Sequence, residues 1–233
     1  LRLDPATGQP RASGALLADL GKPQTLQDES LRRPANLDLQ SSLGSHQLAQ
    51  GARIALDPLA SLSLTAAADL RLDGRLESAG GTVSLKQGAG VTVNPGEQLN
   101  LGASASIDVS GRLLATPGSD SLRRGRVLDG GRVLIDAQSL QWAAGSEIRA
   151  DGALARLDAP RRNAAVFPEG RNQLISSEAG GLSVALFSNA QQDSLLAGRF
   201  VAQAGVGGRA DGLLSVSLGR KTSSEAPASH RLL

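Results

Sequence analysis

Apolar residues in this chain recur in couplets with one residue between them. Between residues 52 and 112 the couplets are Ile54/Leu56, Leu62/Leu64, Leu70/Leu72, Val83/Leu85, Val91/Val93, Leu99/Leu101 and Ile107/Val109, and successive couplets are 8, 8, 13, 8, 8 and 8 residues apart. Residues two apart lie on the same face of an extended strand, whereas a helix places its apolar residues three and four apart. The pattern therefore predicts short β-strands separated by corners rich in Gly, Asn, Asp, Ser and Pro.

Many short strands joined by corners predict a solenoid, in which the chain winds around a stacked apolar core. We expect three strands per turn and a turn of about 20–25 residues, with parallel pairing between successive turns. Parallel crossover connections are right-handed as a rule. The predicted fold is all-β, a right-handed parallel β-helix. Gly-Gly pairs at 80–81, 130–131 and 180–181 are 50 residues apart, which we interpret as about two turns.

The same pattern divides the chain into three parts. Residues 37–219 form the predicted β-helix, with loop extrusions at about 113–130 and 158–173, where the couplets stop. Residues 1–36 carry scattered prolines and predict an irregular arm or cap, and residues 220–233 predict a tail or linker. The couplets resume after each interruption, at Val133/Ile135, Leu140/Trp142, Ile148/Ala150, Leu182/Val184/Leu186, around Phe200 and at Leu214/Val216/Leu218.

Composition fits a layered core. The chain has 233 residues with no Cys, Met or Tyr, one Trp and three Phe, so Leu, Val, Ile and Ala must stack on their own kind. The absence of Cys excludes disulfides and cysteine-ligated metals, and no apolar run is long enough to span a bilayer. A net charge of +2 gives no case for nucleic acid as a partner. Because the chain begins at Leu1, we expect a segment of a longer protein.

The couplets, together with ASIDVSG at 105–111 and GSEIRADG at 145–152, resemble the large exoproteins of the filamentous haemagglutinin type. That resemblance implies a right-handed β-helical shaft and export through an outer-membrane secretion partner to the bacterial surface. It also implies a role as an adhesin on host cells or in biofilm matrix. The secretion domain of such proteins has Asn-Pro-Asn motifs, whereas this chain has Asn94-Pro95-Gly96. A shaft segment is therefore the better match.

The residues offer little material for catalysis or cofactor binding. The only histidines are His46 and His230, and no G-x-S-x-G elbow is present, so neither a catalytic triad nor a histidine metal site is expected. The stretch Gly205–Ala210 matches G-x-G-x-x-G/A in letters, but an alternating strand follows it in place of a helix. No cofactor is predicted.

Carboxylates are the remaining catalytic candidates, because a polysaccharide-cleaving β-helix would need two of them close together. The candidates beside strands are Asp69, Asp73, Asp108, Asp136 and Asp151. Most stand where a corner is expected, and Asp is a common turn residue. We interpret them as structural, with Trp142 pointing inward, and predict no enzymatic activity. A polysaccharide lyase or hydrolase stays open as an alternative.

The two interruptions hold the candidate binding residues, because loops carry specificity more often than the scaffold does. The candidates for a glycan- or anion-binding patch are Arg123, Arg124, Arg126, Arg161, Arg162 and Arg171. If both extrusions leave the same side of the coil, these arginines form one basic surface. The alternative is that they pair with Asp120, Asp129 and Asp158 and only keep the loops soluble.

We therefore predict a secreted, non-enzymatic rod that displays loops for attachment to cells, glycans or matrix polymers. The second alternative, beside a polysaccharide-acting enzyme, is a filament whose subunits associate end to end.

Overall fold

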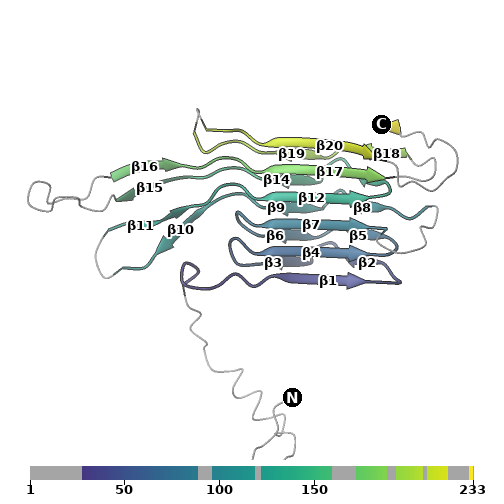
Figure 1. Ribbon diagram of the computed structural model, residues 1–233, viewed down its shortest axis with the longest axis horizontal. Helices are drawn as coiled ribbons and strands as arrows, with labels where there is room; N and C mark the ends of the chain where they lie inside the picture. The colour runs from purple at the N-terminus through teal and green to yellow at the C-terminus, as the bar shows by residue number, and fades with distance from the viewer. Residues whose placement is uncertain are drawn as a thin grey trace, which may run out of the picture.

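The computed structural model describes residues 28–88, 96–118, 122–158, 172–187, 193–206, 209–219 and 231–232. These ranges contain β-strands and turns, and none of them contains a helix. The strands form three parallel sheets of six, six and five strands and two antiparallel hairpins (Figure 1). The predicted all-β class and the parallel pairing are confirmed.

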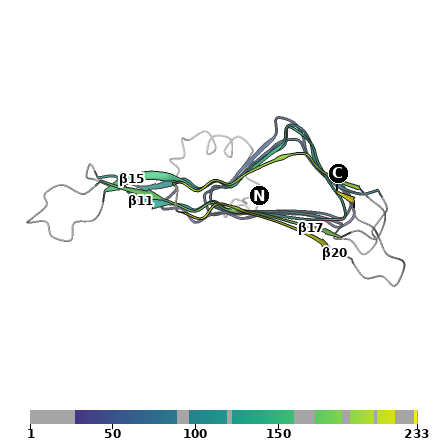
Figure 2. The ribbon, with the colours of Figure 1, turned by 90° about the horizontal axis from the view of Figure 1, so that it is seen from above.

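The chain passes through the three sheets in turn and then returns to the first sheet, one strand further on. The first sheet contains β1 (Leu37–Ser41), β4 (Ser61–Ala66), β7 (Thr82–Gln87), β12 (Arg132–Ala137), β17 (Gly181–Phe187) and β20 (Leu213–Gly219). The second contains β2 (His46–Leu48), β5 (Leu70–Leu72), β8 (Leu99–Leu101), β13 (Leu140–Trp142), β18 (Asp193–Leu196) and β21 (Arg231–Leu232). The third contains β3 (Arg53–Ala55), β6 (Arg75–Glu77), β9 (Ser106–Asp108), β14 (Glu147–Arg149) and β19 (Arg199–Val201). We call one passage through the sheets a rung. From above, successive rungs superimpose around a triangular outline (Figure 2).

The core consists of inward-facing columns that run from rung to rung. In the first sheet, Leu62, Val83, Val133 and Leu182 are paired in sequence across neighbouring strands and are at most 2% exposed. Burial alternates along these strands because successive side chains point to opposite faces. In β4, β7, β12 and β17 the couplets are therefore the inward positions of the strands. Trp142 is 4% exposed and lies in the core, as expected.

The couplet spacing misses one strand of the third sheet, and one couplet cannot be compared with the structure. The 13-residue gap between couplets contains β6, whose single inward residue, Leu76, is fully buried. The couplet Val91/Val93 lies outside the described residues.

The interpretation of the Gly-Gly interval as two turns is wrong. Leu62 pairs with Val83 on the next rung, 21 residues on, whereas Val83 pairs with Val133, 50 residues on. One rung therefore spans the interval between Gly-Gly pairs. This rung is longer than the one from Leu62 to Val83 because a hairpin is inserted into it.

The predicted loop extrusions contain antiparallel hairpins. The first pairs β10 (Leu113–Thr116) with β11 (Arg124–Val127), and the second pairs β15 (Leu154–Asp158) with β16 (Asn172–Ser176). The second hairpin begins at Leu154, whereas the expected extrusion began at about residue 158. These strands pair with each other outside the core, so they carry no inward couplets and their sequence does not mark them as strands.

The two ends of the first sheet are β1 and β20. Residues 220–233, where a tail was expected, contribute β21, which pairs in parallel with β18. The expected arm at 1–36 is described only from residue 28.

Candidate binding surface at the hairpin corner

Both hairpins leave the stack at the same corner. Each follows a strand of the third sheet and precedes a strand of the first sheet, and the two project side by side (Figures 1 and 2). The Asp158 backbone N–H donates to the Arg123 carbonyl oxygen at 2.9 Å, and the Arg123 N–H donates to Asp158 Oδ2 at 2.7 Å. These bonds hold the first hairpin against the second.

The structure describes half of the predicted arginine patch. Arg123, Arg124 and Arg126 lie on or beside β11 and are exposed, and Arg132 at the start of β12 is exposed as well. The other three predicted residues, Arg161, Arg162 and Arg171, lie outside the described residues.

The arginines at this corner differ from those of the third sheet in whether they form ion pairs. Within the described part of the chain, the side chains of Arg123, Arg126 and Arg132 form no ion pair or hydrogen bond. The carboxylates proposed as their local partners are held by the backbone: Asp129 Oδ1 accepts from the Glu178 N–H at 3.1 Å, and Asp158 accepts from Arg123 N–H. Asp120 lies outside the described residues.

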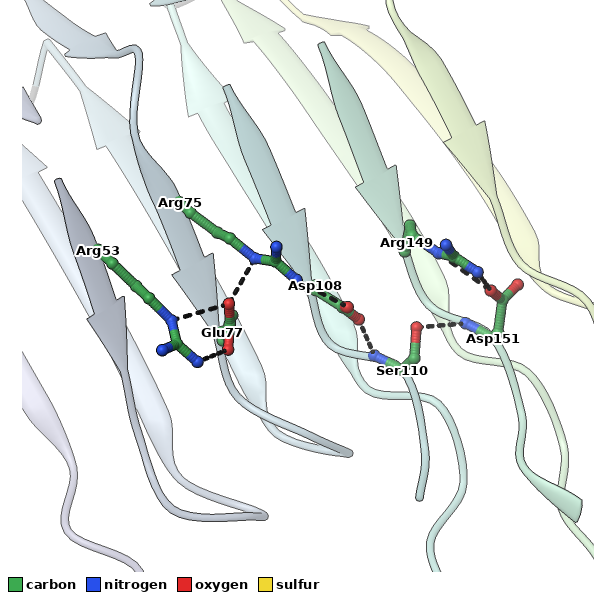
Figure 3. A network of polar contacts seen from close by, with 7 residues as sticks. All are labelled: Arg53, Arg75, Glu77, Asp108, Ser110, Arg149 and Asp151. Atoms are coloured by element: carbon green, nitrogen blue, oxygen red, sulfur yellow. Dashed lines mark hydrogen bonds and ion pairs between the residues drawn. The ribbon is translucent and has the colours of Figure 1, made fainter. Parts of the chain in front are cut away.

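On the outer face of the third sheet, arginines and carboxylates pair across the rungs (Figure 3). Arg53 donates to both oxygens of Glu77, at 3.0 and 2.5 Å, and Arg75 pairs with Glu77 from the same strand. Arg75 also lies 3.9 Å from Asp108 Oδ2. Arg149 pairs with Asp151 at 2.7 Å. We call this set the charge ladder, and its pairing indicates a structural role.

The ladder shifts the ionisation of its members. The hydrogen bonds from Arg53 lower the pKa of Glu77, and burial opposes that shift only in part. In return, Glu77 raises the pKa of Arg53 through the same bonds. Hydrogen bonding to Asp151 likewise raises the pKa of Arg149. Each shift favours the charged form, as expected for opposite charges in contact.

Four of the five candidate catalytic carboxylates accept hydrogen bonds from neighbouring groups. Asp69 accepts from the Gln98 N–H at 2.9 Å, and Asp73 accepts from Arg71 at 2.6 Å. Asp108 accepts from Ser110 N–H, and Asp151 accepts from Gln203 N–H in addition to Arg149. Such bonds to corner backbone are those of turn residues. Asp136 lies on the outer face of β12, between Lys86 and Ala185 of the neighbouring strands.

Metal and nucleotide chemistry find no support in the described residues. They contain no group of three or more His, Asp or Glu placed to hold a metal ion. His46 lies on β2 and pairs in register with Leu70, and His230 lies outside the described residues. The strand β20 follows Gly205–Ala210, where a dinucleotide site would need a helix.

A groove lies at the base of the hairpins and has a volume of about 850 Å³. The three Gly-Gly pairs line it, with Arg126 and Arg132 and with three carboxylates, Asp129, Glu178 and Asp211. Sequence reasoning missed Glu178 and Asp211 as site residues. A usable signal was present, because an acidic residue precedes two of the Gly-Gly pairs, in Asp129-Gly130-Gly131 and Glu178-Ala179-Gly180-Gly181.

A comparison with known protein families, with curated proteins and with solved structures gave no match to this chain. Among the described residues, no helix has the length and apolar character needed to cross a membrane.

Proposed function

We propose that this chain is a right-handed parallel β-helix. We further propose that it serves as a non-enzymatic rod segment of a secreted bacterial surface adhesin, exported with an outer-membrane partner. The order of the three parallel sheets supports the β-helix, and the general handedness of parallel crossovers supports the right hand. The resemblance of its couplets to filamentous haemagglutinin-type exoproteins supports the adhesin class.

We propose that the hairpin corner binds an anionic polysaccharide. One observation carries this proposal: arginines of the third sheet are paired with carboxylates, whereas Arg123 and Arg126 at the hairpins have no side-chain partner among the described residues. An unpaired guanidinium on a projecting hairpin can donate to sulfate or carboxylate oxygens without first breaking an ion pair. Such charge-assisted bonds are the strong ones.

The test measures binding to dextran sulfate, with uncharged dextran as the reference polymer. A double variant, Arg123→Ala with Arg126→Ala, should bind dextran sulfate about tenfold more weakly or worse, because each charge-assisted bond contributes about 1.5–3 kcal/mol. The control, Arg71→Ala with Arg199→Ala, removes the same charge from side chains that are 57% and 74% exposed elsewhere. Equal weakening in both variants would contradict a site at the hairpins.

Association end to end is a second candidate function, favoured by the exposed apolar face of β20. Leu214, Val216 and Leu218 are 40–49% exposed, whereas their partners in β17, Leu182, Val184 and Leu186, are 1–2% exposed. At the opposite end of the sheet, Leu39 of β1 is 39% exposed. A second copy that set its β1 along β20 would continue the apolar columns, and such head-to-tail contacts produce open filaments.

Sedimentation velocity over a range of concentrations tests this second candidate. The wild-type chain should form species whose size grows with concentration, and Val216→Lys should prevent that growth. The neighbouring Ser215→Lys places the same charge on the outer face and should leave association intact. A wild-type chain that stays monomeric throughout excludes the filament.

A further inference from the structure

The groove at the hairpin base crosses several strands of one sheet. Its lining comes from β7, β12, β17 and β20, which are four consecutive strands of the first sheet. Paired strands are about 4.8 Å apart, so three steps give a length of about 14 Å. A groove that crosses strands in this way suits a chain-like ligand lying along the stack.

The six glycines that line the groove offer no free backbone N–H group. The Gly130 N–H donates to the Glu178 carbonyl at 2.9 Å, the Gly131 N–H to Val109 at 2.7 Å, and the Gly181 N–H to Gly131 at 3.0 Å. Because these N–H groups already have partners, a peptide cannot pair with them as an added strand. Recognition must come from the side chains along the walls.

Those walls carry charges of both signs. Arg126 and Arg132 have no side-chain partner among the described residues, and three carboxylates line the same groove. Two of the carboxylates are fixed in place: Asp129 accepts from the Glu178 N–H, and Asp211 accepts from the Ala204 N–H at 3.0 Å. A polyanion would meet the carboxylates and a polycation would meet the guanidinium groups, and like charges in contact oppose binding.

Guanidinium donors beside carboxylate acceptors match hydroxyl groups, which both donate and accept. Leu134 and Leu213 also line the groove and are 41% and 72% exposed, so they offer apolar contact to C–H groups. An uncharged glycan combines hydroxyl groups with C–H faces along an extended chain.

We propose that this groove binds a single strand of an uncharged polysaccharide lying along the stack. The groove shares Arg126 with the anion-binding hairpin surface, whereas Arg132, the three carboxylates and the exposed leucines belong to the groove alone. Arg126 and Arg132 donate to ring and hydroxyl oxygens, while the carboxylates accept from hydroxyl groups.

The experiment titrates the chain calorimetrically with three linear uncharged probes: cellohexaose, laminarihexaose and maltohexaose. At least one should bind the wild-type chain with an affinity that changes little between about 0.1 M and 1 M salt, because no net charge is neutralised. Ser183→Trp places an indole in the groove from the outer face of β17 and should weaken binding about tenfold or more. The control is Ser63→Trp, which lies in the same outward column through Ser84 and Leu134 but does not line the groove.

Three results would overturn the proposal: no binding of any of the three probes, equal binding by Ser183→Trp and Ser63→Trp, or displacement of the bound probe by dextran sulfate at high salt. Dextran sulfate binding by Ser183→Trp separates the two proposals. If Ser183→Trp still binds dextran sulfate while the wild-type chain binds none of the neutral probes, the anion-binding hairpin surface is supported and the groove proposal is contradicted. If the wild-type chain binds a neutral probe while Arg123→Ala with Arg126→Ala leaves dextran sulfate binding unchanged, the groove proposal is supported and the anion-binding hairpin surface is contradicted.

Discussion

At the scale of single residues, the corner between the third and first sheets requires glycine because backbone lies against backbone there. A Cβ added to Gly131 would lie 2.0 Å from the carbonyl oxygen of Gly81 on the preceding rung. Gly51 differs, since it has a φ of 80° and no atom within 4 Å of an added Cβ. Steric contact therefore explains the first glycine, and backbone conformation explains the second.

Gly131→Ala and Gly51→Ala should destabilise the chain to different degrees. We expect a loss of about 3 kcal/mol for Gly131→Ala, because the backbone of neighbouring rungs must separate to admit the methyl group. Gly51→Ala should cost about 1–2 kcal/mol, the price of a left-handed conformation for an L-residue. Urea denaturation of both variants measures the difference, and equal losses would contradict close stacking at the corner.

Glu77 should make the stability of the chain depend on pH in the acid range. Its pKa is lowered in the folded chain from the ordinary value of 4.5 by the hydrogen bonds from Arg53. The unfolded chain therefore binds a proton at a higher pH than the folded chain does. The stabilisation by Glu77 is complete above pH 4.5 and disappears as the pH falls through the lower, folded value.

Urea midpoints of the wild-type chain and Glu77→Gln measure this contribution. At pH 7 the variant should be less stable by up to about 1 kcal/mol, since the pair is partly exposed. The gap should close in acid, where both side chains are neutral. A gap of the same size in acid would show that Glu77 stabilises the fold by packing and not by charge.

At the scale of elements, each strand is held by its inward side chains. Leu85 of β7 is fully buried, whereas Leu134 of the neighbouring β12 is 41% exposed on the outer face. Leu85→Ala should reduce the free energy of unfolding by about 2–5 kcal/mol through the cavity it leaves. Leu134→Ala should change it by less than about 0.5 kcal/mol. Thermal or urea unfolding checks both, and similar losses would contradict the assignment of the two faces.

Apolar couplets predict most of the long strands, because a strand buried on one face must repeat apolar residues at every second position. The strand β6 and the four hairpin strands escape this signal. In β6 only Leu76 points inward, so no couplet forms, and the hairpin strands pair outside the core. The Gly-Gly interval was misread as two turns because the hairpin strands carry no couplets. A hairpin inserted at a corner lengthens the rung without changing the stacking.

The candidate site was predictable only in part. Arg123, Arg124 and Arg126 cluster in the sequence, so an interruption rich in arginine marks them. Glu178 carries a local signal because it precedes a Gly-Gly pair, whereas Asp211 reaches the groove only because rungs stack. Whether an arginine has an ion-pair partner also depends on contacts across rungs, as the bonds from Arg53 to Glu77 illustrate.

At the scale of the whole molecule, three parallel sheets stack rung upon rung and project two hairpins from one corner (Figure 2). Every interior strand of the three sheets is paired on both sides within its sheet. The hairpins and the groove then lie at fixed heights along the stack.

Distances between spin labels along one outward column test the stacking most directly. The chain has no native Cys, so labels attach only at introduced cysteines. Asp38→Cys would be combined in turn with Leu134→Cys, Ser183→Cys and Ser215→Cys, which lie three, four and five strands away in register. The account predicts backbone separations of about 14, 19 and 24 Å, rising by one strand spacing each time. Separations that do not rise in this order would contradict the stacked parallel arrangement.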